Sequence, residues 1–157
     1  MLNGIALPKS GPVAITVTGA PIFPPYNDQS ELTWTSCEMD KCNAHVGQGF
    51  DYHYHGDPYS NSPGTCMYSP SDYASTVSHP PLIGFSADGF FLYGRYLDEL
   101  AEGYSVPLDD CGGHNHGTYG YHYHSQVLTM NATRGGNGLV AGQNYTVFIA
   151  GPYKCNI

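Results

Sequence analysis

The stretch Tyr52-His53-Tyr54-His55 occurs a second time in this chain, 69 residues later, as Tyr121-His122-Tyr123-His124. Residues before each run keep their type and spacing: Asp40 corresponds to Asp109, Cys42 to Cys111, and His45 to His114. Further upstream, residues 19–26 align with residues 89–96 at an offset of 70. A duplication that keeps cysteine and histidine in register predicts two copies of one structural unit, each with a cross-link or a binding site.

The alternation of tyrosine and histidine predicts a strand with two different faces. Residues i and i+2 of a strand point to one face, so the two histidines of each run lie together and the tyrosines lie opposite. Neighbouring imidazoles can bind one metal ion at about 2.0–2.1 Å, and they favour copper or zinc over calcium or magnesium. The candidate metal ligands are His45, His53, His55, His114, His116, His122 and His124, whereas His79 stands apart. Candidate ligands or acceptors that orient a ligating ring are Asp40, Asp109 and Asp110.

Three interpretations of these histidines remain open. A single site shared between the halves would use four imidazoles and be closed to further ligands; its members would be His53, His55, His122 and His124. Two separate sites of three histidines each would leave a coordination position for chemistry. A neutral imidazole also donates and accepts hydrogen bonds, so a buried network without metal is the third interpretation.

Strand patterns separated by turn residues run through the whole chain. Apolar or alternating stretches predict strands at residues 13–18, 22–23, 81–85, 90–93, 121–128 and 145–149. With 20 Gly and 12 Pro among 157 residues, the composition favours turns and strands over helices. We expect one all-β domain over residues 1–157, a compact β-sandwich or barrel-like fold of two pseudo-symmetric half-units with long loops. The expected boundaries are about 12–66 for the first half-unit, 56–81 for the linker and 82–157 for the second half-unit.

The arrangement resembles the YHYH domain family, a group of mostly secreted proteins with poorly defined function. The resemblance covers most of the chain and rests on several motifs: residues 19–23, 42–45, 83–94, 108–114 and 151–155, together with the two Tyr-His-Tyr-His runs. The chain departs from the family pattern at Asn43-Ala44, where glycines are usual, and Cys37 is an addition to it. Family membership implies the architecture more firmly than a function, because function depends on the site.

The cysteine positions predict a disulfide-braced protein. Each half has one cysteine before its histidine run and one after it, which predicts the disulfides Cys42–Cys66 and Cys111–Cys155. Cys37 can replace Cys42 in this scheme, or bridge two chains. Oxidised cysteines fit the low content of Lys and Glu and the resemblance, and they imply an extracellular or cell-surface protein, although the sequence starts without a signal-peptide pattern. Asn131 and Asn144 begin N-x-T acceptors for N-linked glycan.

Charge and motifs exclude several function classes. The net charge is −8 with five Lys and Arg, which argues against nucleic acid and anionic membranes as partners. No apolar run is long enough to span a membrane. An acidic, tyrosine-rich surface suits cations, carbohydrate or other copies of the chain. Nucleophile, phosphate-loop and dinucleotide motifs are absent from the sequence.

We therefore expect a non-enzymatic extracellular structural or assembly module, a subunit of a surface layer, matrix or filament, with a histidine metal site. Low charge, abundant Tyr and Gly and the expected disulfides favour this interpretation. A copper- or zinc-binding protein that sequesters the metal is the first alternative. A metalloenzyme with three histidine ligands is the second, because three ligands leave a coordination position open.

Overall fold

The structure is a computed structural model that describes residues 10–36, 38–47, 49, 51–74, 79–132, 135 and 140–149. Within these ranges the chain forms β-strands and one 3-10 helix but no α-helix, which confirms the all-β prediction. The elements are β1 (Ala14–Thr16), β2 (Pro21–Ile22), β3 (Ala44–Val46), β4 (Tyr52–Tyr54), η1 (Pro70–Tyr73), β5 (Leu82–Ser86), β6 (Phe91–Tyr93), β7 (Gly113–Asn115), β8 (Tyr121–His124), β9 (Gln126–Asn131) and β10 (Asn144–Ile149).

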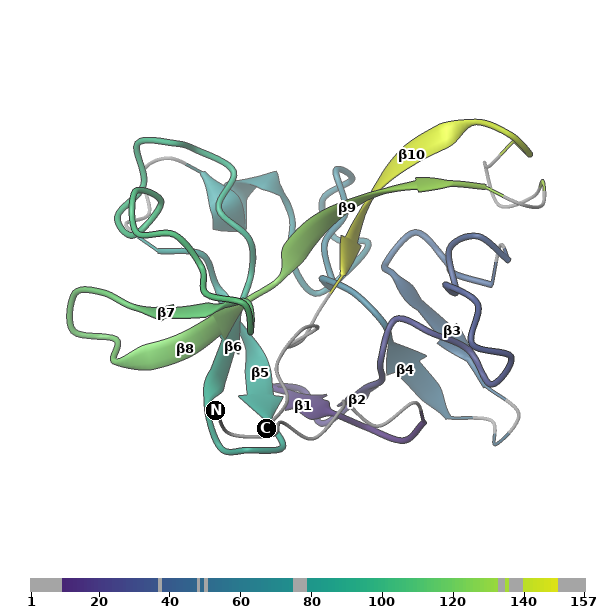
Figure 1. The fold of residues 1–157 in the computed structure, drawn as a ribbon, viewed down its shortest axis with the longest axis horizontal. Helices are drawn as coiled ribbons and strands as arrows, with labels where there is room; N and C mark the ends of the chain where they lie inside the picture. The colour runs from purple at the N-terminus through teal and green to yellow at the C-terminus, as the bar shows by residue number, and fades with distance from the viewer. Residues whose placement is uncertain are drawn as a thin grey trace.

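Eight strands form one curled sheet, half of a barrel, in the order β3-β4-β2-β1-β5-β6-β8-β7 (Figure 1). Each half of the sheet is a unit of four strands, and the strands of the two units follow the same order when each unit is counted inward from its own edge of the sheet. In each unit the first two strands form an antiparallel hairpin, β1–β2 or β5–β6. The second strand then pairs in parallel with a histidine strand, β4 or β8, whose outer neighbour is antiparallel.

The two units meet where β1 pairs with β5, and the register there is self-complementary. Ile15 lies opposite Phe85; the flanking pairs are Ala14 with Ser86 and Thr16 with Gly84. An offset of 70 exchanges these two flanking pairs, so a pseudo-twofold axis passes between Ile15 and Phe85. A Cβ atom at Gly84 would collide with the backbone of Ile15, so this close crossing of the halves requires glycine.

Both hairpins turn at a glycine in the left-handed region, with φ of 88° at Gly19 and 93° at Gly89. Their N–H groups donate to the carbonyl oxygens of Thr16 and Ser86, each at 2.9 Å. Only glycine adopts this conformation without steric cost, which explains why glycine leads each copy of the repeat.

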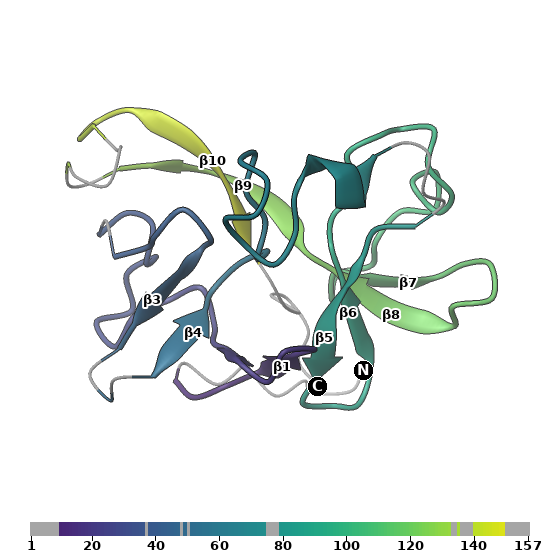
Figure 2. The ribbon, with the colours of Figure 1, turned by 180° about the vertical axis from the view of Figure 1, so that it is seen from behind.

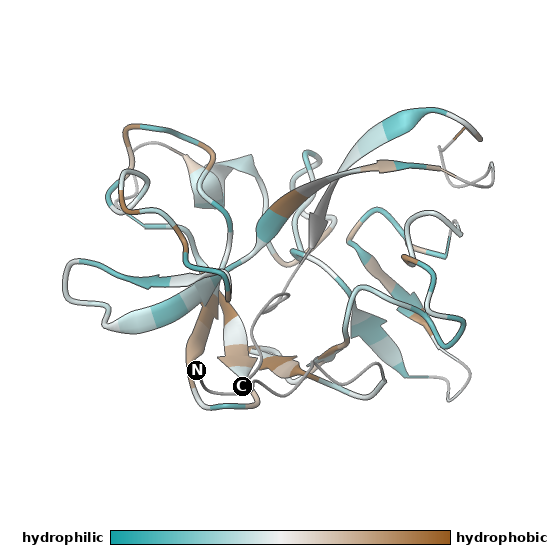
Figure 3. Cartoon of the chain, viewed as in Figure 1, coloured by the Kyte–Doolittle hydropathy of each residue, from teal (hydrophilic) through white to brown (hydrophobic). Residues whose placement is uncertain are grey.

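The hydrophobic core lies on the central strands of the sheet. Its buried members come from both halves: Ala14, Ile22, Cys42, Ala44, Tyr54, Ile83, Leu92 and Tyr123. Hydrophobic residues are concentrated on β1, β5 and β6, whereas β4, β7 and β8 are more hydrophilic (Figure 3). The histidine strands flank this apolar centre and contribute Tyr54 and Tyr123 to the core.

A second, two-stranded sheet is formed by β9 and β10, which arch across the open side of the curled sheet toward β3 (Figures 1 and 2). Met130 on β9 packs with Trp34 and Met39 in a separate buried cluster. The hairpin thus connects the end of the second half to a loop of the first. The strand expected at residues 121–128 is divided at Ser125 into β8 and β9.

The segment between the halves contributes to the interior. Asp57 is fully buried and accepts hydrogen bonds from Arg95 at 2.6 Å, Tyr73 at 2.6 Å and Ser125 at 2.8 Å. Cys66 in the same segment forms the predicted disulfide with Cys42. The linker is therefore a buried connection between the halves over its first part, since residues 53–59 are all buried.

Cys111 is also disulfide-bonded. Its predicted partner, Cys155, and the additional Cys37 lie outside the described residues, so that pairing remains a prediction.

Candidate metal centres

The first Tyr-His-Tyr-His run forms β4 and the residue that follows it, His55, and the second run forms β8; histidine and tyrosine lie on opposite faces. Tyr54 and Tyr123 belong to the hydrophobic core. The four histidines of the runs are all buried: His53, His55, His122 and His124. The outer strands add a further histidine to each half, because His45 on β3 lies opposite His53 and His114 on β7 lies opposite His122.

The turn before each outer strand is organised by a carboxylate. Asp40 Oδ1 accepts from the N–H groups of Cys42 at 2.8 Å and Ala44 at 3.1 Å, and its Oδ2 accepts from the Tyr52 hydroxyl at 2.8 Å. Asp109 makes the equivalent three bonds in the second half, at the same three distances. These carboxylates fix the turn against the first tyrosine of each run.

The hydrogen bonds of Asp40 and Asp109 go to backbone N–H groups and to a tyrosine hydroxyl. Their expected role as ligands, or as acceptors that orient a ligating ring, stays a prediction. Asp110 is exposed and belongs to neither histidine group of the described residues.

In the first half, three imidazoles converge. The Nε2 atom of His45 lies 3.0 Å from Nε2 of His53 and 3.1 Å from Nε2 of His55. Nδ1 of His53 bonds to the carbonyl oxygen of Asp51 at 3.0 Å, and Nδ1 of His55 bonds to that of Pro24. A carbonyl oxygen only accepts, so both Nδ1 atoms carry the proton and both Nε2 atoms present a lone pair.

In the second half, four imidazoles converge, and their ligand atoms all lie within 4.8 Å of one another: His79, His116, His122 and His124. Nε2 of His122 is 3.2 Å from Nε2 of His79 and 3.0 Å from Nε2 of His124. The Nδ1 atoms of these three rings bond to carbonyl oxygens of Pro80, Gly120 and Gly94. Three Nε2 lone pairs therefore face one another here as well.

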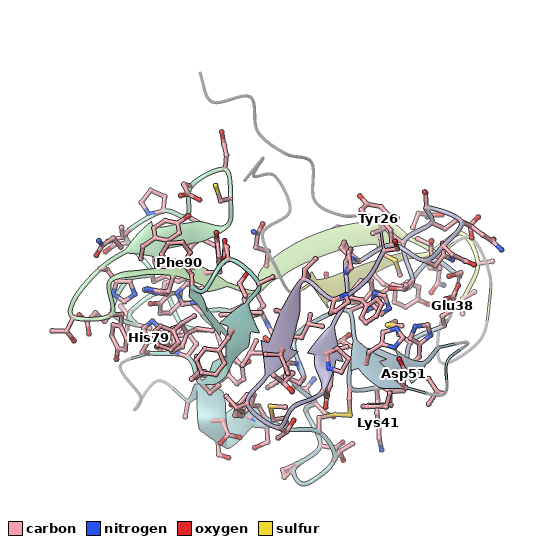
Figure 4. The ribbon with its side chains drawn as sticks, turned by 90° about the horizontal axis from the view of Figure 1, so that it is seen from below. Tyr26, Glu38, Lys41, Asp51, His79 and Phe90 are labelled. Atoms are coloured by element: carbon pink, nitrogen blue, oxygen red, sulfur yellow. A yellow bond between two sulfur atoms is a disulfide. The ribbon has the colours of Figure 1, made fainter. Side chains whose placement is uncertain are left out.

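The clusters are separate, so the alternative of one site shared by His53, His55, His122 and His124 is not formed. Figure 4 shows Glu38 and His79, which mark the two clusters, on opposite sides of the molecule. Of the predicted ligands, His114 is not in the four-residue group, although its ring centroid lies 5.0 Å from that of His122 and 4.9 Å from that of His124.

Lone pairs at these distances repel one another unless a cation lies between them. Nitrogen atoms that each lie about 2.0–2.1 Å from one ion are about 2.8–3.4 Å apart for bond angles of about 90–109°. The observed separations of 3.0–3.2 Å fall in this range.

In the second half, buried Nε2 of His114 and Nδ1 of His116 have no hydrogen-bond partner among the described residues. Nε2 of His116 is bonded to the Tyr96 hydroxyl at 2.8 Å, which leaves Nδ1 as its free ligand atom.

The electrostatic surroundings keep six of the rings neutral, as metal ligation requires. Burial lowers the pKa of His55 to about 4, of His79 to about 4 and of His124 to about 2. Burial also lowers the pKa of His45, His116 and His122. Desolvation penalises a charged imidazolium in each case, and neighbouring imidazoles act in the same direction.

A carboxylate approaches the first cluster from behind. Glu38 Oε2 lies 3.9 Å from Nδ1 of His45. Burial raises the pKa of Glu38, but hydrogen bonds from Ser36 at 2.5 Å and Asn27 at 2.8 Å outweigh this effect and lower the pKa overall. An ionised carboxylate behind a ligating ring orients it and increases its basicity.

Sequence reasoning missed His79 and Glu38. At the offset of 70, His79 corresponds to Lys9, so the repeat that identified the other histidines gave no signal for it. Glu38 corresponds to Pro107 at the offset of 69 and was hidden for the same reason. Neither residue has a counterpart of the same type in the other half. Comparing the two copies of the repeat therefore cannot identify them.

The predicted glycan acceptors lie opposite each other on the second sheet. Asn131 on β9 pairs with Asn144 on β10, and both side chains are exposed. Nδ2 of Asn131 donates to Oδ1 of Asn144 at 3.0 Å and to the carbonyl oxygen of Gly142 at 2.9 Å. Glycosylation at these positions remains a prediction.

Comparison with known proteins identifies a family but no activity. A family model described as YHYH protein matches residues 2–105, which include the first histidine run and end before the second. Neither a curated protein nor a solved structure matches the chain. Among the described residues, no helix has the length and apolar character needed to cross a membrane.

Proposed function

Because the chain belongs to the YHYH protein family, whose description names a motif and no activity, we propose from the geometry that it binds two transition-metal ions, one in each half. One observation carries this proposal: carbonyl oxygens hold the Nδ1 atoms of two rings in the first cluster and three in the second, so their Nε2 lone pairs face into clusters whose Nε2–Nε2 separations are 3.0–3.2 Å. Neutral imidazole is a ligand for copper and zinc, which we take as the expected ions.

The alternative of a metal-free histidine network fits the contacts less well. In the second half, His79, His122 and His124 each carry their proton on Nδ1, where it is donated to a carbonyl oxygen. A neutral imidazole has only one such proton, so the Nε2 atoms have none to donate. The contacts between these Nε2 atoms therefore cannot be hydrogen bonds among neutral rings. Protonating a ring would supply the missing proton, but burial lowers the pKa of His79, His122 and His124 and opposes this. A bound cation resolves the conflict.

The test is metal content per chain after metal-free protein has been incubated with copper or zinc and dialysed. We expect two equivalents for the wild type and one for His53→Ala or His122→Ala, because each variant removes a ligand from one cluster. Tyr54→Phe is the matched control, since Tyr54 lies on the same strand as His53 but faces the core. Equal metal content in wild type and both histidine variants would refute the proposal.

A second candidate function, an extracellular assembly module, is favoured by an apolar patch on the outer face of the central strands. Ile15, Val17, Phe85 and Phe91 are each 41–49% exposed. The pseudo-twofold axis passes between Ile15 and Phe85, so the patch suits a second copy of the chain related by twofold symmetry. The Cys42–Cys66 disulfide supports an oxidising location outside the cell.

Light scattering of the protein across a range of concentrations tests this assembly. We expect a dimer or larger particle that Phe85→Lys dissociates, because a charge at the centre of the patch would have to be desolvated. A wild-type monomer at high concentration would exclude self-association through this face.

A further inference from the structure

The two histidine clusters differ in the feature that decides whether an ion can take another ligand. Three positions are common to both halves at an offset of 69: His45 with His114, His53 with His122, and His55 with His124. The second half adds His79 and His116 to its cluster. The counterpart of His116 is Gly47, and the counterpart of His79 at an offset of 70 is Lys9, which lies outside the described residues. The first half therefore has three imidazoles where the second has four or more.

A cavity lies over the first cluster on the side where Gly47 replaces an imidazole. Its volume is about 380 Å³, and its lining includes His45, His53, His55 and Gly47. Phe23 forms an apolar wall, with its ring centroid 4.3 Å from that of His53. This volume is near the lower end of the range for small-molecule sites.

Four imidazoles fill the coordination of a tetrahedral ion, whereas three leave one position open. The cavity beside the second cluster is lined by His114 and His124 but not by His79, His116 or His122. The second cluster thus has the composition of a closed, structural site. The first has the composition of a site that exchanges a ligand with its surroundings.

We propose that the His45–His53–His55 centre binds a small neutral Lewis base from outside the protein, through an open coordination position that faces the cavity. This inference rests on the proposed binding of metal. The neutral class follows from the acidic lining of the cavity, which includes Glu38 and Asp28. Two acidic side chains on the cavity wall disfavour an anion and leave a neutral donor unaffected.

Cobalt(II) is a suitable probe, because its visible absorption reports the number and kind of ligands. Protein carrying cobalt in both sites is titrated with imidazole, a neutral donor, and with azide, an anion of similar size. We expect imidazole to change the cobalt spectrum of the wild type and of His116→Gln, and to leave that of His45→Gln unchanged. The two variants are matched, because each replaces an outer member of one cluster with a side chain of similar volume.

The charge argument has its own test in Glu38→Gln. The ratio of azide affinity to imidazole affinity should rise by roughly three- to tenfold in this variant, as expected for the loss of one nearby charge. The ratio cancels any change in the position of His45 that affects both ligands equally. An unchanged ratio would overturn the assignment to a neutral ligand.

Different outcomes test the open coordination position and the binding of metal. Two bound cobalt ions and no spectral response to imidazole would overturn the open site and leave metal binding intact, whereas failure to bind cobalt, copper or zinc would overturn both. An equal imidazole response in His45→Gln and the wild type would assign the open position to the second half and overturn the inference. Circular dichroism checks the folding of each variant, and His53→Gln replaces His45→Gln if the latter does not fold.

Discussion

At the scale of single residues, the backbone decides what the histidines can do. A free imidazole exchanges between two tautomers, but carbonyl oxygens fix the proton on Nδ1 of His53, His55, His122 and His124. The acceptors occupy equivalent places in both halves, since Asp51 and Pro24 correspond to Gly120 and Gly94 at offsets of 69 and 70. Because carbonyl groups serve as the acceptors, the side chains at these positions differ freely between the halves.

The pKa values predict how the metal-free protein responds to acid. Burial holds the pKa of His55 at about 4 in the folded state, against about 6.5 in the unfolded chain. Below pH 6.5 the unfolded chain binds protons that the folded protein does not, so the free energy of unfolding falls as the pH decreases from 6.5 to 4. We expect the melting temperature, followed by circular dichroism, to decrease across this range.

His55→Gln provides the control for this prediction. The variant lacks one of the protonating groups, so its free energy of unfolding should depend less steeply on pH, by up to about 1.4 kcal/mol per pH unit. Identical pH profiles for variant and wild type would show that His55 does not contribute to the loss of stability in acid.

At the scale of elements, the sequence predicted the central strands, the histidine strands and their two faces, because alternation and turn residues are local signals. It did not predict the short outer strands β3 and β7. It also named His45 and His114 as candidate ligands, and the structure places them opposite His53 and His122. The sequence could not place His79, which reaches the second cluster from a segment 43 residues before His122. Nor did it show why Asn43 replaces glycine: Asn43 adopts a φ of 61° at the position of Gly112, and its side chain bonds to Trp34 and to the carbonyl of Asp57.

The turn carboxylates provide a test at this scale. Asp109→Ala removes the acceptor of two backbone N–H groups and of the Tyr121 hydroxyl, which should cost about 1–2 kcal/mol in the free energy of unfolding. Asp110→Ala, at the exposed neighbouring position, should change it by less than about 0.5 kcal/mol. Urea denaturation of both variants measures the difference, and equal costs would contradict the assigned role of Asp109.

At the scale of the whole molecule, a buried ion pair fixes one half against the other. Asp57 follows the first histidine run by two residues, and Ser125 directly follows the second. Asp57 binds both Ser125 and Arg95, and the guanidinium of Arg95 also lies over the ring of Tyr59, 4.5 Å from its centroid. The two histidine strands are thus connected through one carboxylate in the interior.

Removing that carboxylate should affect the protein far more than removing an exposed one. Asp57→Asn removes the carboxylate that pairs with the buried Arg95 at 2.6 Å, and we expect a loss of about 3–5 kcal/mol in the free energy of unfolding. Asp51→Asn, at an exposed position, serves as the control in the same urea titration. A similar midpoint for the two variants would mean that the ion pair contributes little to the association of the halves.

The pairing of β1 with β5 about the axis between Ile15 and Phe85 has a consequence for the origin of the chain. Two identical molecules that associate edge to edge around a twofold axis produce this register, in which only the residue on the axis faces its own copy. An ancestor of half the present length would have closed the same sheet as a homodimer with two equal histidine centres. Once both copies belong to one polypeptide, their sequences can diverge, and only the second half has histidines at positions 79 and 116.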